Sequence, residues 1–240
     1  MRVLGVVIAR GGSKGIPNKN IHVLRGKPLI QYTAEAALQS KLANVILTTE
    51  CSDIQRVGQE CGLSVPFTRP TELAQDDTPS LPVIQHAVRF MQEQGESYDA
   101  VLTLQPTNPM RLPSDIDGSI DLLENTDADS VISFVDVGEK HPARMKYIEA
   151  DARVVDPPFG EQFEGQRRQD LKPLYLREGA IYLTRTNVLL EGNSFKGDDC
   201  RAWMIPCERA CNIDEPFDLV MAEMLMEYAD RLQERGPSAN

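Results

Sequence analysis

Near the start of the chain lies a stretch whose residue types suit the binding of phosphate groups. Residues 7–20 read VIARGGSKGIPNKN, so an apolar run leads directly into a glycine-rich, basic turn. Its glycines are Gly11, Gly12 and Gly15, and its cations are Arg10, Lys14 and Lys19. Tight glycine turns expose backbone amides to oxyanions. The spacing fits neither the usual phosphate loop nor the dinucleotide turn, but a strand leading into such a loop favours a phosphate site over an ordinary solvated turn.

A second polar cluster follows a predicted strand in the middle of the chain. Residues 104–109 read LQPTNP, and the two prolines build a rigid turn. The polar side chains of this turn are Gln105, Thr107 and Asn108. A simple turn needs fewer polar groups, so this turn is a candidate binding site. Arg167 and Arg168 are another candidate, because guanidinium groups bind carboxylates in a bidentate manner.

A third cluster precedes the last predicted helix, where residues 211–218 read CNIDEPFD. In an extended segment Asn212 and Asp214 share a side, because side chains alternate along a strand. One carboxylate and one amide oxygen together suit Mg²⁺ that bridges to phosphates. A second interpretation carries equal weight: Asp214 or Glu215 stabilises the positive start of the helix.

An α/β fold must position these clusters. Apolar runs alternate with segments of helical period, which predicts repeated βαβ units around a parallel sheet. The predicted strands span 3–9, 45–49, 65–68, 100–104 and 130–135, and the predicted helices span 28–39, 52 onward, about 82–94 and 113 onward. Ligands of open α/β sheets bind beyond the carboxyl ends of the strands. The basic loop and the 104–109 turn should therefore lie at one edge.

The second half of the chain is less regular. Residues 138–175 are rich in prolines, glycines and charges and predict a lobe with two short strands, at 145–148 and 153–155. The later elements are predicted as strands at 179–183 and 202–205, a closing helix from about Pro216, and a frayed polar tail at 236–240. The helix carries apolar residues at helical spacing, and its methionines are expected to fill the core.

Composition narrows the class of protein. The 240 residues carry a formal net charge of -11, which argues against a nucleic-acid partner. No apolar run approaches the roughly 20 residues of a membrane span and no signal peptide is recognisable, so we expect a cytoplasmic protein. The five cysteines include no C-x-x-C pair, which makes a disulfide framework improbable. For Cys200, Cys207 and Cys211, buried thiols are favoured over a zinc site. No serine-histidine pattern indicates a hydrolase.

Taken together, the motifs resemble those of the acylneuraminate cytidylyltransferases, the CMP-sialic acid synthetases. The similarity runs in order through residues 8–20, 69–70 with 77–80, 104–109, 168–170, 179–182 and 212–214. It implies a Rossmann-like nucleotidyltransferase fold, mostly parallel with helices on both faces, in a single domain, 1–240. A lobe at about 138–175 would reach over the other subunit of a homodimer. The implied reaction joins CTP to a nine-carbon 2-keto-3-deoxy sugar acid, giving a CMP-sugar and pyrophosphate with Mg²⁺ or Mn²⁺.

The resemblance also implies roles for individual residues. The implied catalytic residues are Arg10, Lys19 and Asp214, and the implied metal ligands are Asp214 and Asn212. The implied nucleotide-binding residues are Ala9, Arg10, Gly11, Gly12, Ser13, Lys14, Lys19, Asn20, Arg69 and Ser80. The implied sugar-acid-binding residues are Gln105, Arg144, Arg168, Tyr182 and Phe195.

Three positions depart from the family pattern. Asn212 replaces the usual Asp, Glu178 replaces an Asn, and Phe195 is followed by Lys196 where an aromatic pair is expected. The acceptor therefore stays open among N-acetylneuraminate and legionaminic, pseudaminic or deaminated acids. Two further hypotheses remain: a nucleotidyltransferase with another nucleotide or acceptor, and a nucleotide-binding relative without turnover.

Overall fold

One six-stranded sheet organises the chain. In the computed structural model, which describes residues 1–163 and 165–234, the strand order is β10-β6-β9-β5-β1-β4. The strands are β1 Val3–Ile8, β4 Asn44–Thr48, β5 Ala100–Leu104, β6 Ser130–Asp136, β9 Tyr175–Arg185 and β10 Cys200–Met204. Neighbours are parallel except at β9, which is antiparallel to both β5 and β6. The mostly parallel sheet predicted from the sequence is confirmed.

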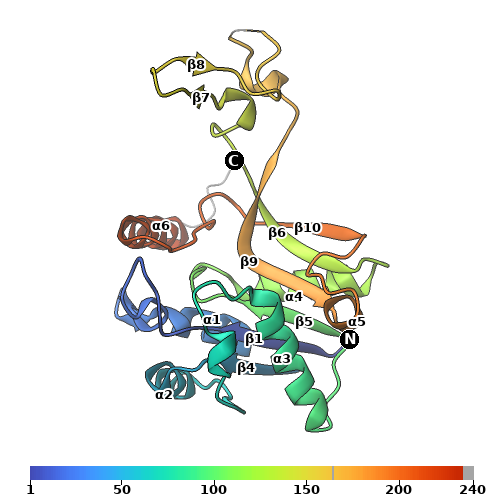
Figure 1. Cartoon of the computed structure of the whole chain (residues 1–240). Helices are drawn as coiled ribbons and strands as arrows, with labels where there is room; N and C mark the ends of the chain where they lie inside the picture. Colours follow the sequence, from blue (N-terminus) through green and yellow to red (C-terminus); the bar gives the residue numbers. More distant parts are fainter. Residues whose placement is uncertain (164, 235–240) are drawn as a thin grey trace.

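Helices cover both faces of this sheet (Figure 1). They are α1 Leu29–Leu38, α2 Ser52–Glu60, α3 Ser80–Glu93, α4 Pro113–Glu124, α5 Thr186–Leu190 and α6 Pro216–Glu234. Because side chains alternate along a strand, Val3 and Val7 of β1 pack with α1, α2 and α4, while Leu4 and Val6 pack with α3 and α5. The continuous apolar run of β1 thus supplies both layers of the core.

One predicted strand is wrong. Residues 65–68 form no strand, although the sequence there is β-branched and aromatic. A single bridge joins Ser64 to Ile46, and Leu47 donates its N–H to the Ser64 carbonyl at 2.8 Å. Pro66 lies two residues after Ser64, and it has no N–H to continue the hydrogen bonding between the strands. The segment instead leads to Arg69, whose N–H bonds the Thr49 carbonyl at 3.0 Å.

The closing helix is present, but two of its methionines do not fill the core as expected. Met221 and Met224 are 39% and 60% exposed. The helix instead buries Ala222 and Met226, which pack on a satellite cluster with Ile213. Helix α6 therefore has two apolar faces, and the one predicted to be buried lies at the surface.

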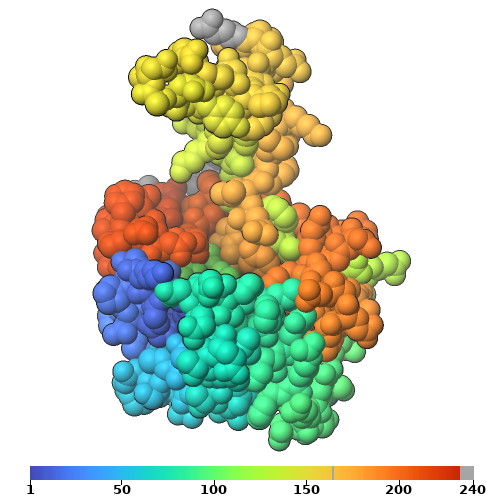
Figure 2. All heavy atoms as spheres, in the orientation of Figure 1, coloured from blue at the N-terminus to red at the C-terminus, as the bar shows by residue number. Residues whose placement is uncertain are grey.

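An arm projects from one side of the body (Figure 2, yellow). Strands β6 and β9 continue past the sheet into it, paired as far as Asp136 and Tyr175. The arm holds a small hairpin of β7 Tyr147–Ile148 and β8 Val154–Val155, close to the two short strands predicted there. Many of its apolar side chains are exposed, with Ile148 at 68%.

Several smaller predictions concern the rest of the chain. The five cysteines are all free thiols, but of the three expected to be buried only Cys211 is, because Cys207 is exposed and Cys200 is partly exposed. No group of metal-binding side chains lies within residues 1–163 and 165–234. A second hairpin, β2 Val23–Leu24 with β3 Lys27–Pro28, precedes α1. No helix in the described part of the chain is long and apolar enough to span a membrane. The frayed tail predicted at 236–240 lies outside the described residues.

Candidate active site

The basic loop leaves the carboxyl end of β1 and is held by contacts with its neighbours. The Ala9 N–H bonds the Thr48 carbonyl of β4 at 3.3 Å. The buried Asn20 side chain donates to the Arg10 carbonyl at 2.9 Å, which closes the loop on itself. Asn18 takes a left-handed conformation, with φ 52°, that asparagine tolerates better than most residues. That turn directs Lys19 and Asn20 back toward the sheet.

Glu50 and Arg69 form a support beneath the loop. Glu50 Oε1 accepts the Gly11 N–H at 2.6 Å, while Glu50 Oε2 lies 3.9 Å from the Arg69 guanidinium. Arg69 also donates to Thr48 Oγ1 at 3.1 Å and to the Ala9 carbonyl at 3.2 Å. Burial lowers the pKa of Arg69 to about 10, which leaves it charged at neutral pH. Arg69 therefore ties the ends of two strands together below the cavity.

Lys19 and Asp214 join two segments that lie far apart in the sequence. Lys19 Nζ lies 2.8 Å from Asp214 Oδ1, and the Lys19 side chain is only 15% exposed. Asn212 Nδ2 donates to the other carboxylate oxygen of Asp214, as expected if the two side chains share one side of the segment. Asp218, and neither Asp214 nor Glu215, caps the helix, because its carboxylate accepts both of their N–H groups at 2.8 Å. Asp214 is thus left to face the loop.

The turn after β5 holds this acidic segment in place. The Ile213 N–H bonds the Thr107 carbonyl at 2.9 Å, and Asn108 Nδ2 donates to the Cys211 carbonyl at 2.9 Å. Asn108 Nδ2 also donates to Glu178 Oε1 at 2.6 Å. The rigid turn predicted from the prolines therefore positions the irregular segment that carries Asp214.

Glu178 is a buried carboxylate with several donors around it. Its Oε2 accepts the Ala180 N–H at 2.7 Å and the Ser133 hydroxyl at 3.1 Å. Burial raises the pKa of Glu178 despite these donors and the neighbouring Arg111. Arg111 is itself buried and donates to the Gln105 carbonyl at 3.1 Å. The side chains of Glu178 and Arg111 therefore both contact the turn after β5.

A cavity of about 460 Å³ opens at this edge of the sheet. Its lining includes the predicted residues Ala9, Arg10, Ser13, Lys14, Lys19, Asn20, Arg69, Ser80, Gln105, Asn212 and Asp214. Gln105 also lines two adjoining hollows of about 310 and 410 Å³. Tyr182 lines both of these, and Phe195 lines the larger. The structure thus brings most of the predicted site residues to one connected set of hollows.

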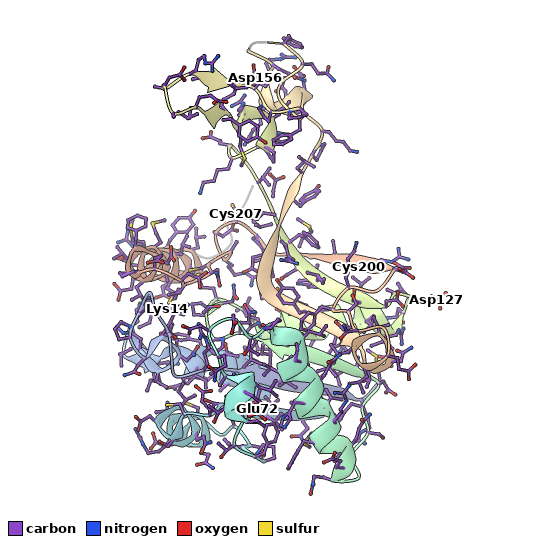
Figure 3. The ribbon with its side chains drawn as sticks, in the orientation of Figure 1. Lys14, Glu72, Asp127, Asp156, Cys200 and Cys207 are labelled. Atoms are coloured by element: carbon purple, nitrogen blue, oxygen red, sulfur yellow. The ribbon has the colours of Figure 1, made fainter. Side chains whose placement is uncertain are left out.

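Four predicted residues lie outside that set. Gly11 and Gly12 belong to the loop but do not line the cavity. Arg144 and Arg168 lie on the arm, where Arg144 contacts Glu161 at 3.5 Å and Arg168 lines a separate hollow with His141. Figure 3 shows the separation, with Asp156 marking the arm and Lys14 the loop. Within one copy of the chain the two arm arginines do not meet the other site residues.

Sequence reasoning missed several residues that shape the site. Glu50, Asp76 and Arg111 act through contacts between segments distant in sequence, and no local pattern indicates those contacts. Arg177 lines both adjoining hollows, with its guanidinium 5.8 Å from the centre of the Tyr182 ring. The one available signal was its place two residues before the 179–182 motif.

The residues present fit a magnesium ion only in part. Asp214 offers a carboxylate that is 61% exposed in the cavity, and Asn212 keeps its amide oxygen beside it. No further carboxylate or imidazole completes a group of three in the described residues. Such a pair suits Mg²⁺ that takes its remaining ligands from phosphates and water. It does not suit an ion bound by protein alone.

The sheet, with its single antiparallel strand and a basic loop at the carboxyl edge, defines a Rossmann-like nucleotidyltransferase fold. A model of the cytidylyltransferase family matches residues 4–194 of this sequence. The chain belongs to that family of enzymes.

Individual relatives agree with this assignment. A CMP-N,N'-diacetyllegionaminic acid synthase of Legionella pneumophila is 32% identical over 229 residues, which cover 95% of this chain and 97% of that protein. An N-acylneuraminate cytidylyltransferase of Streptococcus agalactiae is 30% identical over 98% of this chain and 56% of its own length. The solved CMP:2-keto-3-deoxy-manno-octonic acid synthetase complexed with CTP shares the fold, with a TM-score of 0.70 at 20% identity over 97% of this chain and 100% of that one. The family predicted from the motifs is confirmed.

Proposed function

We propose that the protein transfers a cytidylyl group from CTP to a nonulosonic acid, giving the CMP-sugar and pyrophosphate. The observation that carries the proposal is the cavity in which Arg10, Lys14 and Lys19 face Asp214, joined through Gln105 to two further hollows. The names of the two curated relatives support the acceptor class, and the CTP complex of the structural neighbour supports the nucleotide.

In this reaction the anomeric hydroxyl oxygen attacks the α-phosphorus in line. A new bond forms between that oxygen and phosphorus, the bond to the bridging oxygen of the β-phosphate breaks, and pyrophosphate leaves with the electron pair. Arg10, Lys14 and Lys19 bind the phosphates and stabilise the charge that develops on the leaving group. Asp214, which lies beside Lys19, accepts the hydroxyl proton. Asp214 and Asn212 would hold a Mg²⁺ ion, which would supply charge neutralisation of the phosphate oxygens.

The acceptor belongs in the hollows that Gln105 shares with the main cavity. Tyr182 and Phe195, whose ring centres lie 6.1 Å apart, offer apolar surface, and Arg177 offers a cation for a carboxylate. Arg144 and Arg168 lie on the arm, so in a homodimer they would serve the partner's acceptor hollows. The exposed apolar side chains of the arm support this assembly.

The test is pyrophosphate release with each of four nucleoside triphosphates against a panel of nonulosonic acids. We expect release with CTP and at least one acid. No release with CTP and any acid would reject the proposal, and release that requires GTP or UTP would favour a different nucleotidyltransferase. CTP binding without product would favour the relative without turnover, for which Asn212→Asp is the informative variant.

Replacement of Lys19 or Asp214 with alanine tests the proposed roles. Each change removes one charged group from the cavity and should lower kcat by about 10²- to 10³-fold. The matched control is Lys41→Ala, which breaks a surface ion pair with Asp121 away from the cavity. Circular dichroism should show all three variants folded. Turnover near that of the control would reject the role of the residue concerned.

A further inference from the structure

The cations of the basic loop are paired with carboxylates of the chain itself. Lys19 is paired with Asp214, and a single side chain, Asp76, engages the other two. One oxygen of Asp76 accepts from Arg10, and the other lies 2.7 Å from Lys14 Nζ. The carboxylate thus uses both oxygens on the two cations that the reaction assigns to phosphates.

Asp76 reaches the loop from a short segment that also forms part of the cavity wall. Leu73, Gln75 and Thr78 of this segment line the cavity that contains Arg10 and Lys14. The segment is held mainly by its own contacts: Gln75 Nε2 donates to the Thr71 carbonyl at 2.7 Å, and the Thr78 N–H bonds the Gln75 carbonyl at 3.2 Å. Asp76 is exposed at the edge of the cavity, so it can leave the cations while the segment keeps its structure.

We propose that Asp76 is a specificity-determining residue that competes with the polyphosphate of the nucleotide for Arg10 and Lys14. The inference rests on the proposed function, because it takes the loop as the triphosphate site. Hydrogen bonds from Lys14 and Arg10 lower the pKa of Asp76, so the competitor is ionised at neutral pH. A triphosphate carries enough charge to displace one carboxylate, and a nucleoside monophosphate, which has a single phosphate group and less charge, gains little from doing so.

The same competition acts when the products leave. Pyrophosphate, once formed, is held by the loop cations, and the return of Asp76 to Arg10 and Lys14 offers them a replacement partner. Asp76 therefore weakens the binding of free pyrophosphate as well as that of CTP. Its effect should be small for CMP, which lacks the β- and γ-phosphates.

The experiment compares Asp76→Asn with Glu72→Gln in calorimetric titrations of CTP, pyrophosphate and CMP, with no acceptor present. Glu72 lies four residues away in the same segment (Figure 3), is exposed, and makes no ion pair with the described residues. Both variants remove one negative charge from the segment. We expect Asp76→Asn to tighten CTP and pyrophosphate binding by about three- to fivefold, with CMP changed less than about twofold.

Three outcomes would overturn the proposal. Equal tightening in both variants would mean that net charge, and not the contact with Arg10 and Lys14, determines affinity. Weaker CTP binding in Asp76→Asn would mean that Asp76 positions the two cations for the phosphates. Unchanged affinity for CTP and pyrophosphate would mean that Asp76 does not compete at all. These outcomes are distinct from failure of the proposed function, which would appear as no CTP binding by the unmodified protein or as CTP binding without pyrophosphate release.

Discussion

Glu178 connects one of the smaller hollows to the segment before α6 through a single side chain. It lines one of the smaller hollows, and through Asn108 it reaches the backbone at Cys211. Three donors converge on its two oxygens: Asn108 Nδ2, the Ala180 N–H and the Ser133 hydroxyl. A carboxylate satisfies all three donors because it offers only acceptors.

We predict that Glu178→Gln destabilises the protein although the side chain keeps its size. The glutamine amide has one acceptor oxygen, so at least one of the three donors faces another N–H. An unsatisfied buried donor costs about 1–3 kcal/mol. The measurement is the free energy of unfolding in urea at pH 7. Equal stability of the two proteins would contradict this account.

The same variant has a predicted pH dependence. Burial raises the pKa of Glu178 above its ordinary 4.5, so the folded protein binds this proton at a higher pH than the unfolded chain. Lowering the pH through the folded pKa therefore adds stability from this group, and raising it removes that stability. The glutamine of the variant does not titrate. The stability gap between wild type and Glu178→Gln should widen as the pH falls toward 4.5, and a gap that narrows would contradict the sign.

At the scale of elements, the site depends on the close approach of the basic loop to the segment before α6. A Cβ added at Gly15 would lie 2.4 Å from the Asp214 carbonyl, which is backbone and cannot swing away. A Cβ added at Gly12 would meet nothing within 4 Å. Neither glycine has a positive φ, so space alone separates them.

Gly15→Ala and Gly12→Ala therefore form a matched pair. We expect Gly15→Ala to push the loop away from Asp214 and to lower the free energy of unfolding by about 1–3 kcal/mol. Gly12→Ala should stay within about 0.5 kcal/mol of wild type. Urea titrations of both variants give the comparison. Similar losses in the two would show that the loop conformation, and not the contact with Asp214, makes these glycines necessary.

The sequence predicted the elements better than the contacts between them. Periodicity and apolar runs located β1, β4, β5 and most helices, because those patterns are local. The strand prediction at 65–68 was wrong because it gave more weight to the β-branched residues than to Pro66. Pro66 has no N–H, so strand pairing ends there. The exposed face of α6 could not be recognised either, since apolar spacing alone does not say which of two faces meets the body.

The same limit applies to the site. The loop, Gln105 and Asp214 carry local motifs and were predicted, and the cavity brings them together. Asp76 and Glu50 carry no such motif, and their importance depends on which distant segment lies opposite. Whether Arg144 and Arg168 belong to the site depends on an assembly that one chain does not contain.

At the scale of the whole molecule, the arm is the part least explained by a single chain. Its exposed apolar residues include Met145 at 51% and Phe163 at 60%, and its arginines lie away from the cavity. A homodimer in which each arm covers the other copy would account for both observations.

We predict that Arg168→Ala and Lys19→Ala, each poorly active alone, complement each other when co-expressed. If Arg168 acts across the interface, each mixed dimer has one site with both residues intact, which gives about a quarter of the wild-type activity at random pairing. Pyrophosphate release measures the recovery, and light scattering on a sizing column checks the dimer. Mixed dimers without recovery would place Arg168 in its own chain's site or outside it.

Strand β9 has a consequence for how this protein could change during evolution. Its eleven residues run from the arm into the sheet and carry Arg177, Glu178 and Tyr182 on the way. Residues 130–185 therefore unite the arm with part of the lining of the two adjoining hollows, including Arg177 and Tyr182, in one continuous cassette, whereas the basic loop, Arg69 and Ser80 precede it in the chain. An exchange of that cassette between relatives would alter acceptor choice and subunit pairing together. It would leave the proposed nucleotide-binding residues unchanged.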